Sequence, residues 1–185
     1  MRKFILLLFA CLLAVPAIGA AALMRGAGDG TLSVQDGQGR IVIDVRSGGV
    51  IGRFDRGFVT ILDRTPDDAF EPKVWGAMRE VELGIDQVRH YGPGVRFRLI
   101  GGSFRIVING SGIDLSAVGS GVVSLEGKGR FPGVYSFDGE DCSVPRSRCK
   151  PLPEEAQRFR LGTVEVPERD ASRPSPERPS ARSTP

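Results

Sequence analysis

Apolar and polar residues alternate along most of the chain in short runs, and glycine, aspartate or serine separates one run from the next. RIVIDV, from Arg40, and VRFRLI, from Val95, are two such runs. This period of two places the apolar side chains on one face of a strand. Helical spacing occurs only in PEEAQRFR, from Pro153, where we predict one or two turns of helix. The pattern therefore predicts an all-β domain.

A repeat organises these runs. RIVIDVRSGGVIGRFDRGFVTI, from Arg40, has a looser second copy in RIVINGSGIDLSAVGSGVVSL, from Arg105. Each copy is predicted to be a pair of hairpins, within repeat units of about 30–63 and 95–127. Gly101-Gly102 is the predicted two-residue turn of the second unit, because such turns need positive φ.

Three-residue turns are predicted at 55–57 and 119–121, each ending in glycine, which adopts the left-handed conformation without strain. Pairing outwards from all these turns places one set of apolar residues on a common face. The predicted core is Leu32, Val34, Ile41, Ile43, Ile51, Ile61, Val95, Phe97, Leu99, Phe104, Ile106, Ile108, Leu115 and Leu125.

More strands are expected in REVELG and DQVRHY, around a turn at Gly84, and in GVYSFDG and RLGTVEV. One double-hairpin unit is marginally stable alone, so two units should cover each other. We therefore predict an antiparallel β-sandwich or barrel built from two repeated double-hairpin units. A short β-solenoid, whose rungs also repeat with glycine at the corners, is the alternative.

The two ends of the chain differ from its middle. Residues 1–22 have Arg2 and Lys3 before an apolar stretch and small residues after it, which is typical of a secretory signal peptide. A retained membrane anchor is the alternative. Residues 167–185 are rich in Pro, Ser and Arg and predict a disordered tail. A single domain over 23–166 remains.

Charge and cysteine content narrow the class of protein. The net charge of +3 includes the signal peptide, and residues 23–166 hold 19 Lys and Arg against 19 Asp and Glu. This balance argues against a nucleic-acid partner, which usually requires a clustered basic excess. Cys142 and Cys149 lie close in sequence and predict a disulfide, as expected of an exported protein.

Candidate catalytic chemistry is sparse. His90 is the only histidine, and the chain has neither a nucleophile-elbow nor a zinc-hydrolase motif, so no catalytic site, metal or cofactor is predicted. The predicted hairpin at 119–121 would set Asp114 opposite Glu126. Two facing carboxylates can act as the acid and base of a glycosidase, whereas the plainer interpretation is solvated surface charge.

Arg96, Arg98 and Arg105 fall on the polar face of the predicted hairpin, with Arg98 opposite Arg105. Like charges that oppose each other on a sheet are unfavourable, so an acid should lie near. One hypothesis is an internal partner such as Glu80 and Glu82. The other is a ligand site for an anionic glycan or lipid headgroup, which guanidinium groups suit.

GGVIGRFDRG, from Gly48, and FRLIGGSFRIVINGSGIDLSAVGSG, from Phe97, carry a resemblance. Between about Gly30 and Gly139 the chain resembles an uncharacterised family of small exported bacterial β-rich proteins. The glycine-punctuated GSGIDLSAVGSGVVSLEG also resembles exported β-solenoid adhesins. Neither resemblance implies a catalytic residue.

These observations predict an exported β-domain of the periplasm, cell envelope or extracellular space with a binding or structural role. The expected partner is an anionic envelope glycan or another envelope protein, and membrane contact is expected only through the signal peptide before cleavage. An envelope carbohydrate-active hydrolase that uses the Asp114 and Glu126 pair is the alternative.

Overall fold

The computed structural model describes residues 24–25, 30–66, 71–142, 144 and 147–162, and none of them is helical. They form one eleven-stranded sheet, in which every pair is antiparallel except β1 with β11. The strands are β1 (Met24–Arg25), β2 (Thr31–Phe54), β3 (Arg56–Asp63), β4 (Lys73–Trp75), β5 (Arg79–Gly84), β6 (Gln87–Tyr91), β7 (Val95–Ile100), β8 (Phe104–Gly127), β9 (Val134–Ser136), β10 (Lys150–Pro151) and β11 (Gln157–Leu161).

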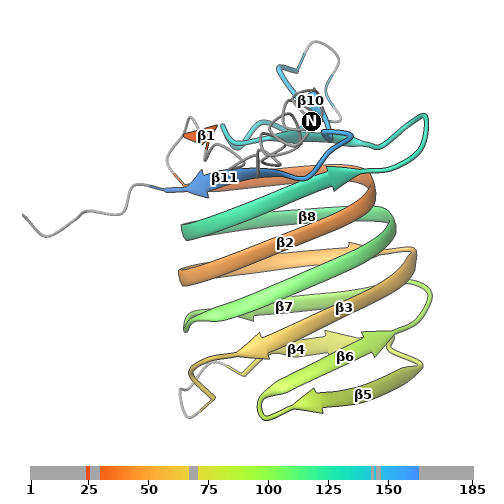
Figure 1. The fold of residues 1–185 in the computed structure, drawn as a ribbon, viewed down its shortest axis with the longest axis vertical. Coiled ribbons are helices and arrows are strands. Elements are labelled where there is room, and N and C mark those ends of the chain that lie inside the picture. Colours follow the sequence, from red (N-terminus) through yellow and green to blue (C-terminus); the bar gives the residue numbers. More distant parts are fainter. Residues whose placement is uncertain (1–23, 26–29, 67–70, 143, 145–146, 163–185) are drawn as a thin grey trace, which may run out of the picture.

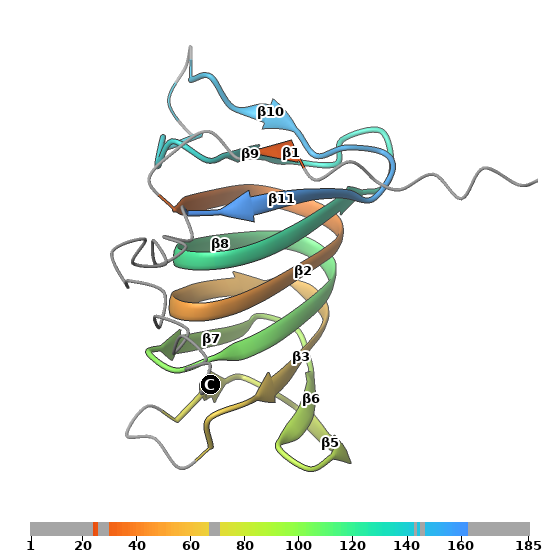
Figure 2. The same cartoon turned by 60° about the vertical axis from the view of Figure 1, so that its left-hand side comes forward.

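Two long strands, β2 and β8, organise the sheet. Each has 24 residues, and they pair with each other in two registers. Ile41 of β2, for example, lies opposite Ile108 on one side and Leu125 on the other. Because each long strand bends and meets its partner again, the sheet curls into an open half-barrel (Figures 1 and 2).

We call the two sides of this curled sheet the front wall and the back wall, as seen in Figure 1. The front wall consists of β11, 121–127 of β8, 39–45 of β2, 104–110 of β8, β3, β6 and β5. The back wall consists of β10, β9, 31–37 of β2, 113–118 of β8, 48–54 of β2, β7 and β4.

The core lies between the walls. In β7 the buried Val95, Phe97 and Leu99 alternate with the exposed Arg96 and Arg98. Burial of each large apolar side chain contributes about 1.5–3 kcal/mol. The core residues predicted from alternation are confirmed with one exception, because Ile51 is 54% exposed on the outside of the back wall.

The hairpins predicted within the two repeat units are wrong. β7 pairs with β2 and β4 and not with β8, so Gly101-Gly102 does not close a hairpin. β3 pairs with β6 and β8 and not with β2, so residues 55–57 do not close one either. Residues 119–121 lie inside β8, where the strand bends and continues.

Glycine residues that suggested hairpin turns in the sequence lie instead at bends within long strands. Gly48 and Gly119 lie directly opposite each other at a bend, with φ of 147° and 137°. A Cβ atom on Gly119 would collide with the Ser47 carbonyl oxygen, so only glycine lets the two backbones approach there. Glycine thus marks corners of continuous strands, as at β-bulges and barrel bends.

The remaining predicted elements are a hairpin around Gly84, a helix near Pro153 and the two ends of the chain. The hairpin of β5 and β6 around Gly84 is confirmed. The predicted helix near Pro153 is wrong: Gln157–Leu161 is a strand, whose Phe159 and Leu161 are buried with a period of two. The predictions for 1–22 and 167–185, and most of RLGTVEV, lie outside the described residues.

The disulfide between Cys142 and Cys149 is confirmed, with a Cα–Cα distance of 5.7 Å. A disulfide indicates a non-cytoplasmic compartment. A search of the described residues finds no helix with the length and apolar character that crossing a membrane requires.

Candidate functional site

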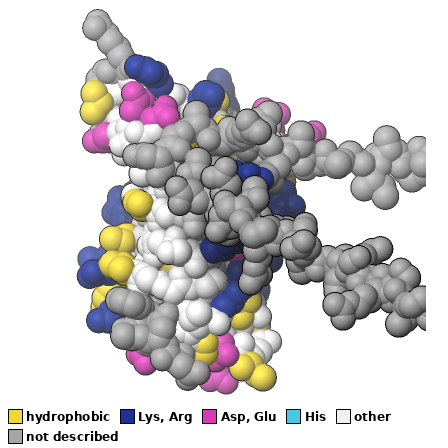
Figure 3. All heavy atoms as spheres, turned by 90° about the vertical axis from the view of Figure 1, so that its left-hand side faces the viewer, with side chains coloured by type: hydrophobic (Ala, Val, Ile, Leu, Met, Phe, Trp, Pro, Cys, Tyr) yellow, Lys and Arg dark blue, Asp and Glu magenta, His cyan; other side chains and the backbone are white. Residues whose placement is uncertain are grey.

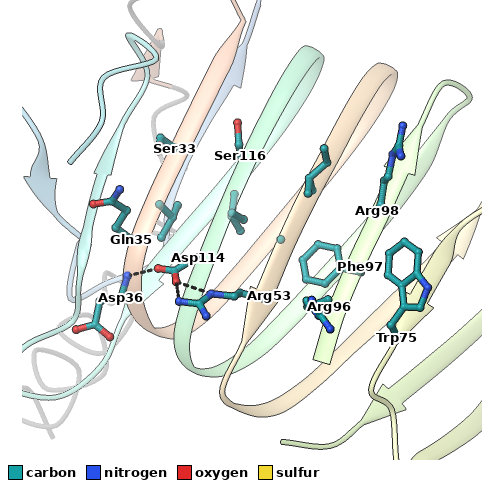
Figure 4. A pocket seen from close by; sticks show the side chains of 14 residues that line it. Ser33, Gln35, Asp36, Arg53, Trp75, Arg96, Phe97, Arg98, Asp114 and Ser116 are labelled. Carbon is teal, nitrogen blue, oxygen red and sulfur yellow. Dashed lines mark hydrogen bonds and ion pairs between the residues drawn. The ribbon is translucent and has the colours of Figure 1, made fainter. Parts of the chain in front are cut away.

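A groove of about 910 Å³ crosses the outer surface of the back wall (Figure 4). It runs over the segments of β2 and β8 in that wall and continues over β7 to β4. Neighbouring strands lie about 4.8 Å apart, so the two segments of β2, the segment of β8, β7 and β4 together span roughly 19 Å. The groove is therefore long enough for an extended ligand.

Two rows of outward side chains cross this groove, because residues directly opposite on neighbouring strands share a face. The first row is Asp114, Arg53, Arg96 and Trp75. The second row is Ser33, Ser116, Ile51, Arg98 and Lys73. Arginine, lysine and one aromatic ring thus gather over β7 and β4, whereas β2 and β8 present the Arg53 and Asp114 pair and two hydroxyl groups.

Arg53 is held in place by Asp114. Its Nε and Nη2 atoms donate hydrogen bonds of 2.9 and 2.7 Å to one carboxylate oxygen of Asp114. The other oxygen accepts a 2.8 Å bond from the backbone N–H of Asp36. The hydrogen bond and the charge of Asp114 raise the pKa of Arg53 above its usual value. This ion pair is part of the groove lining.

Arg96 and Arg98 are in a different situation. Neither forms an ion pair or a side-chain hydrogen bond with any residue in the described part of the chain. Arg96 lies directly opposite Arg53, whose charge Asp114 already balances, and Arg98 lies directly opposite Lys73, which has no ion pair in the described part of the chain. Like charges in such positions destabilise a sheet. A bound anion would offset this repulsion.

The front wall shows the opposite arrangement. Arg105 lies opposite Asp44, with 3.9 Å between Nη1 and the carboxylate, and Arg40 lies opposite Glu126. Cross-strand charges on that wall are therefore complementary. The groove differs from this wall in that Arg98 lies opposite another cation, Lys73.

The predicted arginine stripe is thus split between the walls. Arg96 and Arg98 line the groove, whereas Arg105 is on the front wall beside Asp44. The predicted pairing of Arg98 with Arg105 is wrong, because β7 and β8 are not neighbours. The proposed acid partner Glu80 instead lies 3.1 Å from the buried His90.

The predicted pairing of Asp114 with Glu126 is also wrong. Asp114 lies opposite Arg53 on the back wall, whereas Glu126 lies opposite Arg40 on the front wall. Glu126 Oε1 is 3.7 Å from Lys128 Nζ. The two carboxylates therefore do not face a common substrate. Among the described residues, no group of three or more His, Cys, Asp or Glu is placed to hold a metal ion.

Trp75, Ile51 and Arg53 were not predicted as site residues. Trp75 is 48% exposed and stands beside Arg96 at the end of the groove (Figure 4). The sequence gives only a weak indication that these three residues share a site, because alternation alone does not show which strand lies next to β4. Figure 3 shows basic and hydrophobic side chains together along its left-hand flank, where the back wall lies.

Comparisons with known proteins give no further identification: no family model, no curated protein and no solved structure matches the chain.

Proposed function

We propose that this protein is an exported, non-enzymatic binding domain of the cell envelope or extracellular space, and that its groove binds an anionic glycan. The observation that carries the proposal is the pair of arginines without an acid partner among the described residues, Arg96 and Arg98, beside an exposed Trp75; Arg98 in addition lies opposite another cation, Lys73. Such an arrangement is costly without an anion and favourable with one.

The groove offers three kinds of contact that suit an acidic sugar chain. The Arg96 and Arg98 guanidinium groups can donate paired hydrogen bonds to a carboxylate or a phosphate. The Trp75 ring provides a flat apolar surface against which a sugar ring can pack. The Ser33 and Ser116 hydroxyls, which bond no described side chain, can exchange hydrogen bonds with sugar hydroxyls.

Export is supported by the signal-peptide pattern in residues 1–22 and by the disulfide. The proposal also keeps the resemblance to small exported bacterial β-rich proteins.

Descent of the fold from two related units is supported by the equal length of β2 and β8 and by their similar sequences. The two facing walls favour describing the half-barrel as a flattened sandwich.

Trp75 makes the proposal directly testable, because it is the only tryptophan of the chain. Its fluorescence should change on titration with polygalacturonate or heparin, and not with neutral dextran. The double variant R96Q/R98Q should bind at least about tenfold more weakly, and rising salt should reduce the difference from wild type. R158Q/R160Q, on exposed front-wall positions, removes the same charge outside the groove.

Equal weakening by the two double variants would mean that only net charge matters, and would contradict a groove site. No response of Trp75 to any acidic polymer would contradict it as well.

A further inference from the structure

An exposed apolar patch adjoins the groove on the back wall. It consists of Ile51, Ile100 and Val118, with exposures of 54%, 39% and 54%. Val118 and Ile100 lie on either side of Gly49, directly opposite it in the register. Gly49 has no side chain, and a Cβ atom there would lie 3.2 Å from the Leu99 carbonyl oxygen and 3.7 Å from Ile100 Cγ1.

The chemistry of the wall changes stepwise along the strands. The row of Arg53 and Arg96 comes first, the row of Ile51 and Arg98 second, and the row of Val118, Gly49 and Ile100 third. Each step is two residues, about 7 Å along a strand. Anion-binding and apolar surfaces therefore lie within the reach of one ligand molecule.

We infer that the ligand is lipid-linked: an acidic sugar headgroup occupies the groove and its aliphatic chain lies on the apolar patch. This inference rests on the proposed function, since it names the ligand of the same groove. It gives the exposed apolar side chains a partner of matching chemistry, and burial of a chain there is favourable in proportion to the area covered.

A second copy of the protein fits this wall less well. Two back walls packed together would bring Arg53, Arg96, Arg98 and Lys73 of both copies into one interface with few acids to balance them. An anionic amphiphile has complementary charge, and a second copy does not.

The test separates the acid from the chain with four soluble probes, used below their critical micelle concentrations. These are methyl glucoside, methyl glucuronide, octyl glucoside and octyl glucuronide. Binding is followed by Trp75 fluorescence and calorimetry on the mature, disulfide-bonded protein. Octyl glucuronide should bind at least about tenfold more tightly than methyl glucuronide, as expected when two or three methylene groups leave water.

Two variants assign each half of the ligand to its surface. I100S/V118S should remove the advantage of the octyl chain and leave the affinity for methyl glucuronide unchanged. R96Q/R98Q should remove the advantage of the carboxylate and leave octyl glucoside binding unchanged. Circular dichroism and thermal unfolding check that both variants fold.

The outcomes test the lipid-linked ligand and the anionic glycan site separately. Equal affinities for methyl and octyl glucuronide would overturn the lipid-linked ligand and leave the proposed function standing. Equal affinities for octyl glucoside and octyl glucuronide would overturn the proposed function itself. Self-association that I100S/V118S abolishes, without any effect of the octyl chain, would identify a second copy as the occupant and overturn the inference.

Discussion

Asp44 is the acid around which arginines of the front wall converge. Its two carboxylate oxygens accept hydrogen bonds of 2.7 and 3.0 Å from Arg64, and Arg105 lies 3.9 Å away. The hydrogen bonding of Arg64, helped by the charges of Arg105 and Arg46, holds the pKa of Asp44 below its usual value, although burial opposes the shift. Both partners are partly exposed, so the contribution is that of a surface ion pair, about 0.2–1 kcal/mol.

We expect Asp44→Asn to lower the free energy of unfolding by about 0.5–1 kcal/mol at neutral pH. A lowered folded-state pKa means that this stabilisation is present above the unfolded value of 3.8 and is lost as pH falls through the folded value. Urea unfolding of both proteins should therefore give a difference at pH 7 that begins to close as pH falls below 3.8. Glu155→Gln, at an exposed position, is the control; a difference independent of pH would contradict the role of the Asp44 charge.

At the scale of the element, the bends of β2 and β8 decide the fold. Each long strand passes from one wall to the other as one continuous strand, although its register shifts at the bends, so a single strand contributes to both faces of the core. Facing glycines such as Gly48 and Gly119 permit the close backbone approach at these bends. A side chain there would force the strands apart.

Gly119→Ala should accordingly lower the free energy of unfolding by about 1–3 kcal/mol, because alanine tolerates φ of 137° poorly and its methyl group would collide with the Ser47 carbonyl. Gly84→Ala is the matched control in β5, where a Cβ atom would meet only the Gln87 side chain at 3.9 Å. Thermal and urea unfolding measure both. A cost at Gly84 equal to that at Gly119 would show that chain entropy, not the bend, is responsible.

At the scale of the molecule, the two walls enclose one core and present different charge patterns to the outside. The disulfide joins Cys142 to Cys149, and Asp141, directly before Cys142, accepts a 2.9 Å hydrogen bond from Gln35 in the groove lining. One end of the disulfide therefore adjoins the site, and neither cysteine belongs to the core.

We expect C142S/C149S to lower the free energy of unfolding by about 2 kcal/mol, the size expected for a short closed loop. Because Trp75 is on β4, at the opposite edge of the back wall from β9 and β10, the position of the Trp75 emission maximum should stay unchanged. Chemical unfolding followed by fluorescence gives both values. A shift of the emission maximum in the folded state would show that the disulfide shapes the groove.

Prediction from sequence succeeded where the physics is local. Phe97 and Ile106 are buried as alternation predicted, because successive side chains of a strand point to opposite faces whatever its neighbours are. Prediction failed where one local sequence feature is compatible with two different structures. Glycine at 119 and 121 is equally consistent with a turn and with a bend, and the choice moved Asp114 away from Glu126.

The sequence by itself determined the all-β class, the buried face of most strands, the disulfide, and the outward placement of Arg96 and Arg98. Only the tertiary structure decided which strands are neighbours, and so which charges meet: Arg96 with Arg53, Arg98 with Lys73, Arg105 with Asp44. The reason is physical. The direction of a side chain follows from its own backbone, whereas its cross-strand partner is set by the curl of two 24-residue strands around a shared core.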